Sequence, residues 1–250
     1  MGERFRSFTA AYKESDLWIG VHPASRSSRM EDFAAGIARS LRLELEAYIA
    51  RRPEFLASLV PIAPDESAPP LARAMIAASG WAGVGPMAAV AGAVAEAVGL
   101  SLEAEFGCRE IIVENGGDLR LRFEAPLELS VFAGVSPLSE RVGVTIPAEL
   151  SPLGVCTSSG TVGPSLSLGR ADAVMVACAD AAAADAWATR IGNAVSSSAD
   201  IEAALKLAKE GPASAGAGRG EIASVLIVVG DKMGMVGKLP LKMFAAPKGR

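Results

Sequence analysis

The spacing of apolar residues changes once along this chain, near residue 110, and that change limits the fold class. Up to that point most of the chain has apolar residues at helical spacing, and beyond it short β-compatible runs follow one another. Helices are predicted at residues 30–52, 71–79, 86–105, 181–195 and 200–210. Strands are predicted at residues 5–12, 17–21, 110–114, 119–123, 127–135, 142–146, 154–157, 173–178, 222–229 and 235–239.

This order of elements predicts an α+β fold with antiparallel sheets and helices packed on them. Strands, helices and strands come first, and the same succession then repeats, so the chain can consist of two pseudo-repeated halves. No repeat of individual residues accompanies this order. Because no low-complexity linker separates the halves, we expect a single domain over residues 1–250.

Local sequence patterns predict where several elements begin and end. Ser28 is a candidate N-cap of the first long helix, with Glu31 at the capping-box position. Residues 80–85 are expected to form a loop, and residues 212–220 a flexible loop rich in Gly, Ala and Ser. A hairpin across residues 230–234 is expected to close the chain.

The composition excludes several kinds of partner. A net charge of −4, with no basic stripe carrying aromatic residues, argues against nucleic acid. Residues 81–100 have the length of a membrane span, but Pro86, Glu96 and many small residues favour a buried helix and no membrane. Three cysteines without metal-type spacing indicate free thiols. We expect a cytoplasmic protein, because residues 1–16 show no signal peptide.

We expect the functional site to be built by the stretch from Glu114 to Asn193. Its first candidate is the turn at Glu114–Asp118, which contains Asn115, Gly116, Gly117 and Asp118. Two glycines between strands permit positive φ, and their outward amides can hold a phosphate or another anion. Asp118 can accept a hydrogen bond from a ribose or orient a water on a metal. The alternative is a plain hairpin, because Asn-Gly is a strong hairpin signal.

The second candidate is a polar loop after a short strand, made of Thr157, Ser158, Ser159, Gly160 and Thr161. Its hydroxyls and amides suit phosphate or nucleotide oxygens, although the Gly-Lys-Thr/Ser ending of a P-loop is missing. A surface turn is the alternative interpretation. Cys156, just before the loop, is either a buried structural thiol or the nucleophile of a sulfur-handling protein, and the second reading requires an exposed thiolate of low pKa.

The third candidate is a pair on a predicted helix, Asp185 and Thr189. Their spacing of four places a carboxylate and a hydroxyl on one face, and such hard oxygen donors fit Mg²⁺ when phosphate completes its coordination. Asp180 and Asp185 can equally be N-terminal acids that favour the helix dipole. His22 is the one histidine and precedes a proline in a predicted turn, so we interpret it as a surface residue, and a zinc site built on several histidines is excluded.

Taken in order, these three motifs resemble the ApbE family, the FAD-dependent protein flavin transferases. The matching segments are N-G-G-D at 115–118, T-S-S-G-T at 157–161 and A-D-A-x-A-T at 184–189. The wider sequence, at residues 83–93 and 156–167, is closer to a separate ApbE-like branch. The resemblance implies a duplicated fold of the T-fold type, with Asp185 and Thr189 as Mg²⁺ ligands.

The chain also departs from the transferases. Residues 164–169, which follow the T-S-S-G-T loop, contain no histidine, and residues 87–89 lack the lysine of the family. We therefore expect an ApbE-like protein that binds a small phosphate-bearing ligand with Mg²⁺. The ligand is FAD or another nucleotide. Such binding can persist even where flavin transfer has been lost. The alternatives are the thiol chemistry at Cys156 and a non-enzymatic binding or scaffold module. The oligomeric state is open, with a homo-oligomer as one possibility.

Overall fold

The computed structural model describes residues 4–162, 167–209, 218 and 220–245. The helices in this part of the chain are α1 (Met30–Arg51), α2 (Pro53–Ala57), α3 (Pro70–Ala82), α4 (Val90–Phe106), α5 (Ala181–Asn193) and α6 (Ile201–Lys209). The strands are β1 (Arg6–Tyr12), β2 (Ser15–Val21), β3 (Ile111–Asn115), β4 (Asp118–Arg122), β5 (Leu127–Ser130), β6 (Val142–Ile146), β7 (Leu153–Ser158), β8 (Ala173–Cys178), β9 (Ile222–Val229), β10 (Lys232–Gly237) and β11 (Leu241–Met243).

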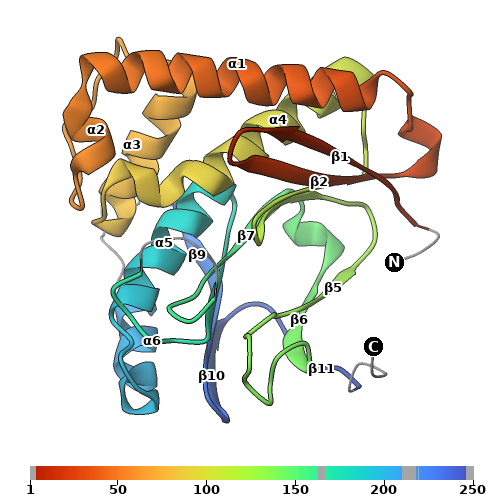
Figure 1. The fold of residues 1–250 in the computed structure, drawn as a ribbon. Helices are drawn as coiled ribbons and strands as arrows, with labels where there is room; N and C mark the ends of the chain where they lie inside the picture. Colours follow the sequence, from red (N-terminus) through yellow and green to blue (C-terminus); the bar gives the residue numbers. More distant parts are fainter. Residues whose placement is uncertain (1–3, 163–166, 210–217, 219, 246–250) are drawn as a thin grey trace.

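The strands form two antiparallel sheets (Figure 1). The larger sheet has the order β1-β2-β3-β4-β7-β8-β9-β10, and the smaller one has the order β11-β6-β5. Every neighbouring pair in both sheets is antiparallel. The expected α+β class with antiparallel sheets is therefore confirmed.

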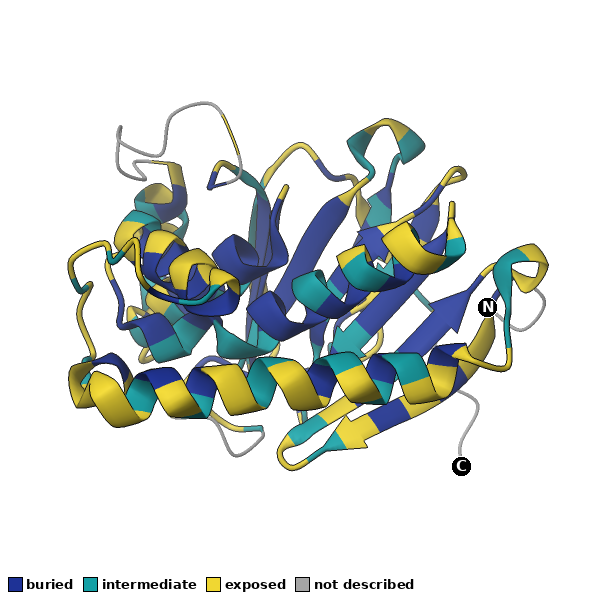
Figure 2. Ribbon diagram, turned by 90° about the horizontal axis from the view of Figure 1, so that it is seen from above, coloured by how far each residue is buried: buried dark blue, intermediate teal, exposed yellow. Residues whose placement is uncertain are grey.

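The large sheet lies between a layer of helices and the small sheet. One hydrophobic core joins the helices to one face of the large sheet, and a second core fills the space between the two sheets. Side chains alternate between the faces of a strand, so neighbouring residues of β3 belong to different cores: Ile111 and Val113 to the first, Ile112 to the second. In Figure 2, α1 crosses in front of the strands with its exposed face turned away from them.

The two halves of the large sheet show the same order of elements. Hairpin β1-β2, a set of helices and hairpin β3-β4 form the first half, and hairpin β7-β8, helices α5 and α6, and hairpin β9-β10 form the second. The halves meet where β4 pairs with β7. The duplication of one ancestral unit stays a prediction.

Helix α4 is rich in apolar residues. Within the described residues, the stretch Pro86–Phe106 is the one helical segment with the length and composition of a membrane span. The inner face of α4 is buried through Gly92, Ala93, Val94, Ala95, Val98, Gly99 and Leu102. These residues pack against α1, α5 and β3, as expected for a buried core helix.

Two predicted helix boundaries are wrong. Ser28 does not cap α1, because the N-cap position falls one residue later, at Arg29, which makes no capping hydrogen bond through its side chain; Ser27 Oγ accepts a hydrogen bond from Arg29 N at 3.3 Å. The expected loop at residues 80–85 is instead the last turn of α3, which runs to Ala82 and ends at Gly83 in the left-handed conformation (φ 74°). Apolar contacts of the last turn carry the helix past Gly80, and Gly83 is the C-terminal glycine.

Other differences concern short elements. Strand β5 ends at Ser130, not at residue 135, because the backbone turns where Ser136 N donates to Ala133 O at 3.0 Å. The last hairpin turns within two residues, since Lys232 already pairs with Val229. Helix α2 and strand β11 had no prediction, and nearly all of the expected loop at 212–220 lies outside the described residues.

Candidate functional site

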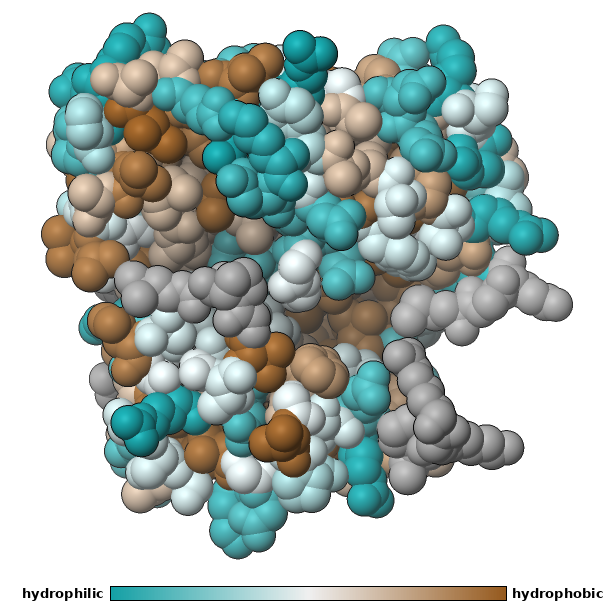
Figure 3. All heavy atoms as spheres, viewed as in Figure 1, coloured by the Kyte–Doolittle hydropathy of each residue, from teal (hydrophilic) through white to brown (hydrophobic). Residues whose placement is uncertain are grey.

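The main cavity of the structure has a volume of about 990 Å³ and collects residues from all three sequence motifs. The β3-β4 hairpin, the end of β7 and one face of α5 supply its polar wall. The face of the molecule shown in Figure 3 is hollowed near its centre, where apolar residues lie inside the hollow. The polar wall consists of Glu114, Gly116, Gly117, Asp118, Thr157, Ser158, Ser159, Asp185, Thr189 and Asn193.

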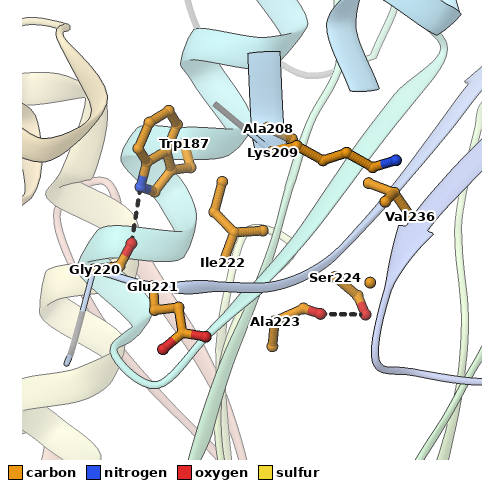
Figure 4. Close-up of a pocket in the computed structure, with 10 residues that line it drawn as sticks. Trp187, Ala208, Lys209, Gly220, Glu221, Ile222, Ala223, Ser224 and Val236 are labelled. Carbon is orange, nitrogen blue, oxygen red and sulfur yellow. Dashed lines mark hydrogen bonds between the residues drawn. The ribbon is translucent and has the colours of Figure 1, made fainter. Parts of the chain in front are cut away.

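A second cavity, of about 270 Å³, lies beside Trp187 of α5 (Figure 4). There the indole of Trp187 donates a hydrogen bond to Gly220 O at 3.2 Å. Its charged lining is one lysine, Lys209, and one glutamate, Glu221, whose carboxylate pairs with Lys238 at 3.0 Å. None of the sequence motifs contributes a predicted site residue to it, so the larger cavity is the candidate site.

The β3-β4 hairpin turns through Gly116 (φ 65°) and Gly117 (φ 100°), with Asn115 paired to Asp118. Two consecutive positive φ values are costly for any residue with a Cβ, which explains why both central positions are glycine. The predicted turn is therefore present, and both of its glycines lie on the cavity wall.

Asp118 begins β4 and is buried, with 8% of its surface exposed. Its Oδ1 accepts a hydrogen bond from Thr157 N at 3.3 Å. Burial, with a smaller contribution from the charge of Glu114, raises the pKa of Asp118 to about 7 against the opposing effects of the nearby Cys156 thiol and the Thr157 amide. This carboxyl group therefore holds its proton to a higher pH than an exposed aspartate does.

Asp185 lies in the second turn of α5 and faces the same cavity. Its Oδ2 accepts a hydrogen bond from Gly92 N, near the start of α4, at 2.9 Å. Burial raises the pKa of Asp185 well above its usual range, and the charge of Asp118 raises it further against the backbone amides of Gly92 and Ala91. The two carboxyl groups therefore repel each other across a desolvated space.

The remaining polar residues of α5 continue the wall that Asp185 begins. Thr189 and Asn193 follow it at intervals of four residues, and all three line the cavity. Asn193 Oδ1 also accepts a hydrogen bond from Leu168 N at 2.9 Å, which holds the loop before β8 against the helix. The predicted pair Asp185 and Thr189 is thus on one face, and Asn193 extends it.

Three predicted site residues do not line the cavity and instead hold the elements that do. Asn115 Nδ2 donates to Ala91 O at 3.1 Å and ties β3 to the start of α4. Thr161 donates its hydroxyl hydrogen to Asp172 at 3.1 Å, and Gly160 N donates to Ala171 O at 2.8 Å. Of the 157–161 loop, Thr157, Ser158 and Ser159 reach the cavity.

Cys156 lies behind the polar wall and is fully buried. Its thiol donates to Ala181 O at 3.2 Å. Burial and the charges of Asp118 and Asp185 raise the pKa of this thiol well above its usual value. The exposed thiolate of low pKa that the sulfur-handling alternative requires is therefore absent at Cys156. The interpretation of a buried structural thiol is confirmed.

His22 is also remote from the cavity. It is exposed at the end of β2, and its Nδ1 accepts a hydrogen bond from Ala24 N at 3.3 Å. It does not belong to the lining, which agrees with its interpretation as a surface residue.

The charged side chains that line the described part of the cavity are all acidic: Glu114, Asp118 and Asp185. No lysine or arginine accompanies them in this lining. Among the described residues, no group of three or more His, Cys, Asp or Glu forms a complete metal cage. Two carboxylates with a threonine hydroxyl fit Mg²⁺, which uses one or two carboxylates and completes its coordination with water and substrate phosphate.

Sequence reasoning missed most of the apolar lining and three polar residues, Ser58, Ser130 and Asn193. Asn193 shares the four-residue spacing of Asp185 and Thr189, so the helical period could have found it. The apolar lining comes from several segments that are distant in the sequence, and no local pattern predicts that they meet. It consists of Trp18, Leu56, Leu59, Val84, Met87, Ala88, Val90, Ala91, Ile112, Leu119, Leu129, Val131, Phe132, Val155, Val162, Leu168 and Met175.

Comparison with known proteins shows the family of the chain. A family model described as "AbpE bacteria" matches residues 1–226. A UPF0280 protein of Methanosphaerula palustris is 49% identical over 189 residues, which cover 76% of this chain and 74% of that protein. A UPF0280 protein of Methanocaldococcus jannaschii is 43% identical over 230 residues, which cover 91% and 89%.

The fold has a solved counterpart. The flavinyl transferase ApbE of Pseudomonas stutzeri, in its apo form, superimposes with a TM-score of 0.53 and covers 93% of each chain. Its sequence identity is 13%, so this likeness concerns the fold alone. Together with the family match, it bears out the resemblance of the three motifs. The chain belongs to an ApbE-like family, the one that contains the UPF0280 proteins.

Proposed function

We propose that this protein binds a phosphate-bearing nucleotide, of the flavin type, as its Mg²⁺ complex in the 990 Å³ cavity. Asp185 and Thr189 act as metal ligands, and Gly116, Gly117 and Asp118 border the phosphates. One observation carries the proposal: Asp118 and Asp185 face one cavity, with raised pKa values, and no basic side chain lies in its described lining.

The negative charge of the lining determines in which form a phosphate group can bind in the cavity. Three acidic side chains without a cation repel a free phosphate, and they repel each other. A divalent cation held by Asp185 and Thr189 would weaken both repulsions, because it would supply the positive charge that this lining lacks. Thr157, Ser158 and Ser159, at the same wall, offer hydroxyls and amides to phosphate oxygens.

The apolar part of the cavity suits the ring system of such a ligand. Trp18, Ile112 and Leu119 of the large sheet and Leu129 of the small sheet line the space between the sheets. A volume of about 990 Å³ is at the upper end of the range for small-molecule sites, about 300–1,000 Å³. This supports a ligand as large as a dinucleotide, and FAD is the probe we would use first.

The likeness to a flavinyl transferase raises flavin transfer as an activity. Bound Mg²⁺ would supply charge neutralisation at a pyrophosphate that releases a nucleotide. The described lining offers neither a basic side chain nor a histidine for proton transfer, and residues 164–169 contain no histidine. These observations favour binding without transfer, so flavin transfer is the second candidate function. Release of AMP from FAD separates the two.

The test is a thermal-shift titration with FAD, FMN and ADP, each with Mg²⁺ and with EDTA. At a concentration of 100 times Kd, a ligand raises Tm by about 5–10 °C for a chain of this size. We expect this shift with Mg²⁺ and its loss in Asp185→Asn. Asp231→Asn, in the exposed turn before β10, is the matched control. If none of the three nucleotides with Mg²⁺ stabilises the wild type, the proposal is wrong.

A further inference from the structure

Arg120 of β4 is the largest fully buried side chain of the described structure. Its guanidinium is held by two carboxylates of α4. Arg120 Nε lies 3.0 Å from Glu96 Oε1, and its Nη2 lies 2.9 Å from Glu103 Oε1. The second oxygen of Glu103 pairs at 3.0 Å with Arg122, which is largely exposed.

The other oxygen of Glu96 reaches the helix that carries the candidate metal ligands. Glu96 Oε2 accepts a hydrogen bond from Ala181 N, the first residue of α5, at 3.1 Å. Ala181 N is one of the amides without a partner inside the helix, and a carboxylate there is favourable for the helix dipole. Glu96 therefore joins Arg120 on the sheet to the first turn of α5.

A second link runs parallel to the first. Gly92 lies one turn before Glu96 on α4, and Gly92 N donates to Asp185, which lies one turn after Ala181 on α5. The two helices are thus connected at both ends of one helical turn. On the sheet side, Asn115 and Arg120 hold the same stretch of α4 from the two strands of the β3-β4 hairpin.

These contacts connect the two elements that carry Asp118 and Asp185. Asp118 and Arg120 are two residues apart on β4, so their side chains leave the strand on the same face. Asp118 is fixed to β4 and Asp185 to α5. The Arg120–Glu96–Ala181 connection spans from one of these elements to the other, and it sets their relative position.

The contacts around Arg120 and Ala181 are so close that two neighbouring glycines of α4 cannot carry a side chain without displacing other atoms. A Cβ added to Gly99 would lie 3.0 Å from Arg120 Cγ, and one added to Gly92 would lie 2.2 Å from Ala181 O. A buried ion pair contributes little net stability compared with apolar residues of similar volume. Its presence between helices rich in Ala and Gly therefore indicates a geometrical role, because two carboxylates that repel each other must be held at a fixed separation.

We propose that Arg120 and Glu96 are positioning residues that set the separation of Asp118 and Asp185, and so the affinity for the divalent cation. This inference rests on the proposed function of the cavity. Neither residue touches the ligand. Their effect passes through the start of α5 and the face of β4.

The test uses the double variant Arg120→Met/Glu96→Gln. It removes both buried charges together, leaves Glu103 paired with Arg122, and keeps an oxygen for Ala181 N. Arg122→Met is the matched control, because Arg122 pairs with the same Glu103 but does not reach Glu96. Mn²⁺ alone, titrated by electron paramagnetic resonance, serves as the probe for the metal, and hydrogen exchange reports the amides of the first turn of α5.

We expect the double variant to remain folded, to bind Mn²⁺ about ten-fold more weakly, which is the lower end of the loss for outer partners of metal ligands, and to exchange those amides faster. Arg122→Met should match the wild type in both measurements. A folded double variant with wild-type Mn²⁺ affinity would overturn the inference, and so would an equal loss in Arg122→Met. If the wild type itself binds no Mn²⁺, the proposed function fails instead.

Discussion

The carboxyl groups of Asp118 and Asp185 show how strongly a single site can depend on its surroundings. On an exposed loop either group would be charged above about pH 4. Here burial raises the pKa of Asp118 to about 7, and it raises that of Asp185 as well. Because the folded state holds these protons more tightly than the unfolded state, the two groups stabilise the fold when protonated and lose that contribution as pH rises.

The pH dependence of stability follows from this sign. Between about pH 4, the unfolded pKa, and about pH 7 the folded protein binds more protons at Asp118, so its contribution to the free energy of unfolding falls as pH rises. We expect the Tm of the metal-free wild type to fall more between pH 5.5 and pH 8 than that of Asp118→Asn. Circular dichroism melts in EDTA measure both. Parallel melts at all pH values would contradict the raised pKa.

Residue types and their spacing predicted most of the polar residues that line the cavity. They did not predict in which direction every side chain points. Asp185 and Thr189 could be placed together because the helical period fixes which residues share a face. Thr161 looked like a ligand residue, yet its hydroxyl is taken by Asp172. Which partner a loop hydroxyl chooses depends on tertiary contacts that a short polar motif does not encode.

At the scale of elements, the contact between α4 and α5 fixes the position of Asp185. The helices approach so closely at Gly92 that any side chain there would meet the backbone of Ala181. Gly36, by contrast, lies in α1 with nothing within 4 Å of the position of a Cβ. Because both glycines lie in helices, a substitution at either one has a similar effect on helix propensity. The effects differ because of the atoms that surround each position.

These glycines give opposite predictions for the same substitution. Gly92→Ala should destabilise the protein by about 1–3 kcal/mol, the cost of overpacking, and weaken Mn²⁺ binding because α5 is displaced. Gly36→Ala should stabilise it by about 0.5–1 kcal/mol, because alanine favours a helix interior. Urea denaturation measures both free energies. Equal effects of the two substitutions would show that the close contact is not important.

Long periodic elements were predicted well, and short ones were not. The first long helix was expected at residues 30–52 and is found at Met30–Arg51, because its apolar stripe extends over many turns. Helix α2 and strand β11 are too short to show a period, and their existence depends on what they pack against. The pairing of Arg120 with Glu96 likewise joins two elements that only the packed fold brings together.

At the scale of the whole molecule, the two halves share the large sheet and the core between that sheet and the helices. Residues Leu119–Leu121 of β4 pair with Leu153–Val155 of β7, and the helix-side core contains residues of both halves. The sequence predicted the α+β class and the single domain from element order and the lack of a linker. It could not predict the arrangement of the helices, the small sheet and the cavity, because contacts between distant segments produce them.

One cooperative unfolding transition follows from this shared sheet. Breaking the β4–β7 pairing exposes the core of both halves, so neither half is expected to persist alone. Differential scanning calorimetry of the full chain should show a single peak with equal calorimetric and van't Hoff enthalpies. Two separate peaks would contradict the single-domain expectation.

The raised pKa of Asp118 has a consequence for the heat of binding. If a divalent cation binds the charged carboxylates as proposed, its binding near pH 7 will expel protons into the buffer. We expect the apparent binding enthalpy by isothermal titration calorimetry to be more negative in Tris, which releases heat when it takes up the expelled protons, than in phosphate, whose protonation releases little heat. At pH 9 the difference attributable to Asp118 should shrink towards zero. Nucleotide uptake by this protein would therefore be a small source of acid.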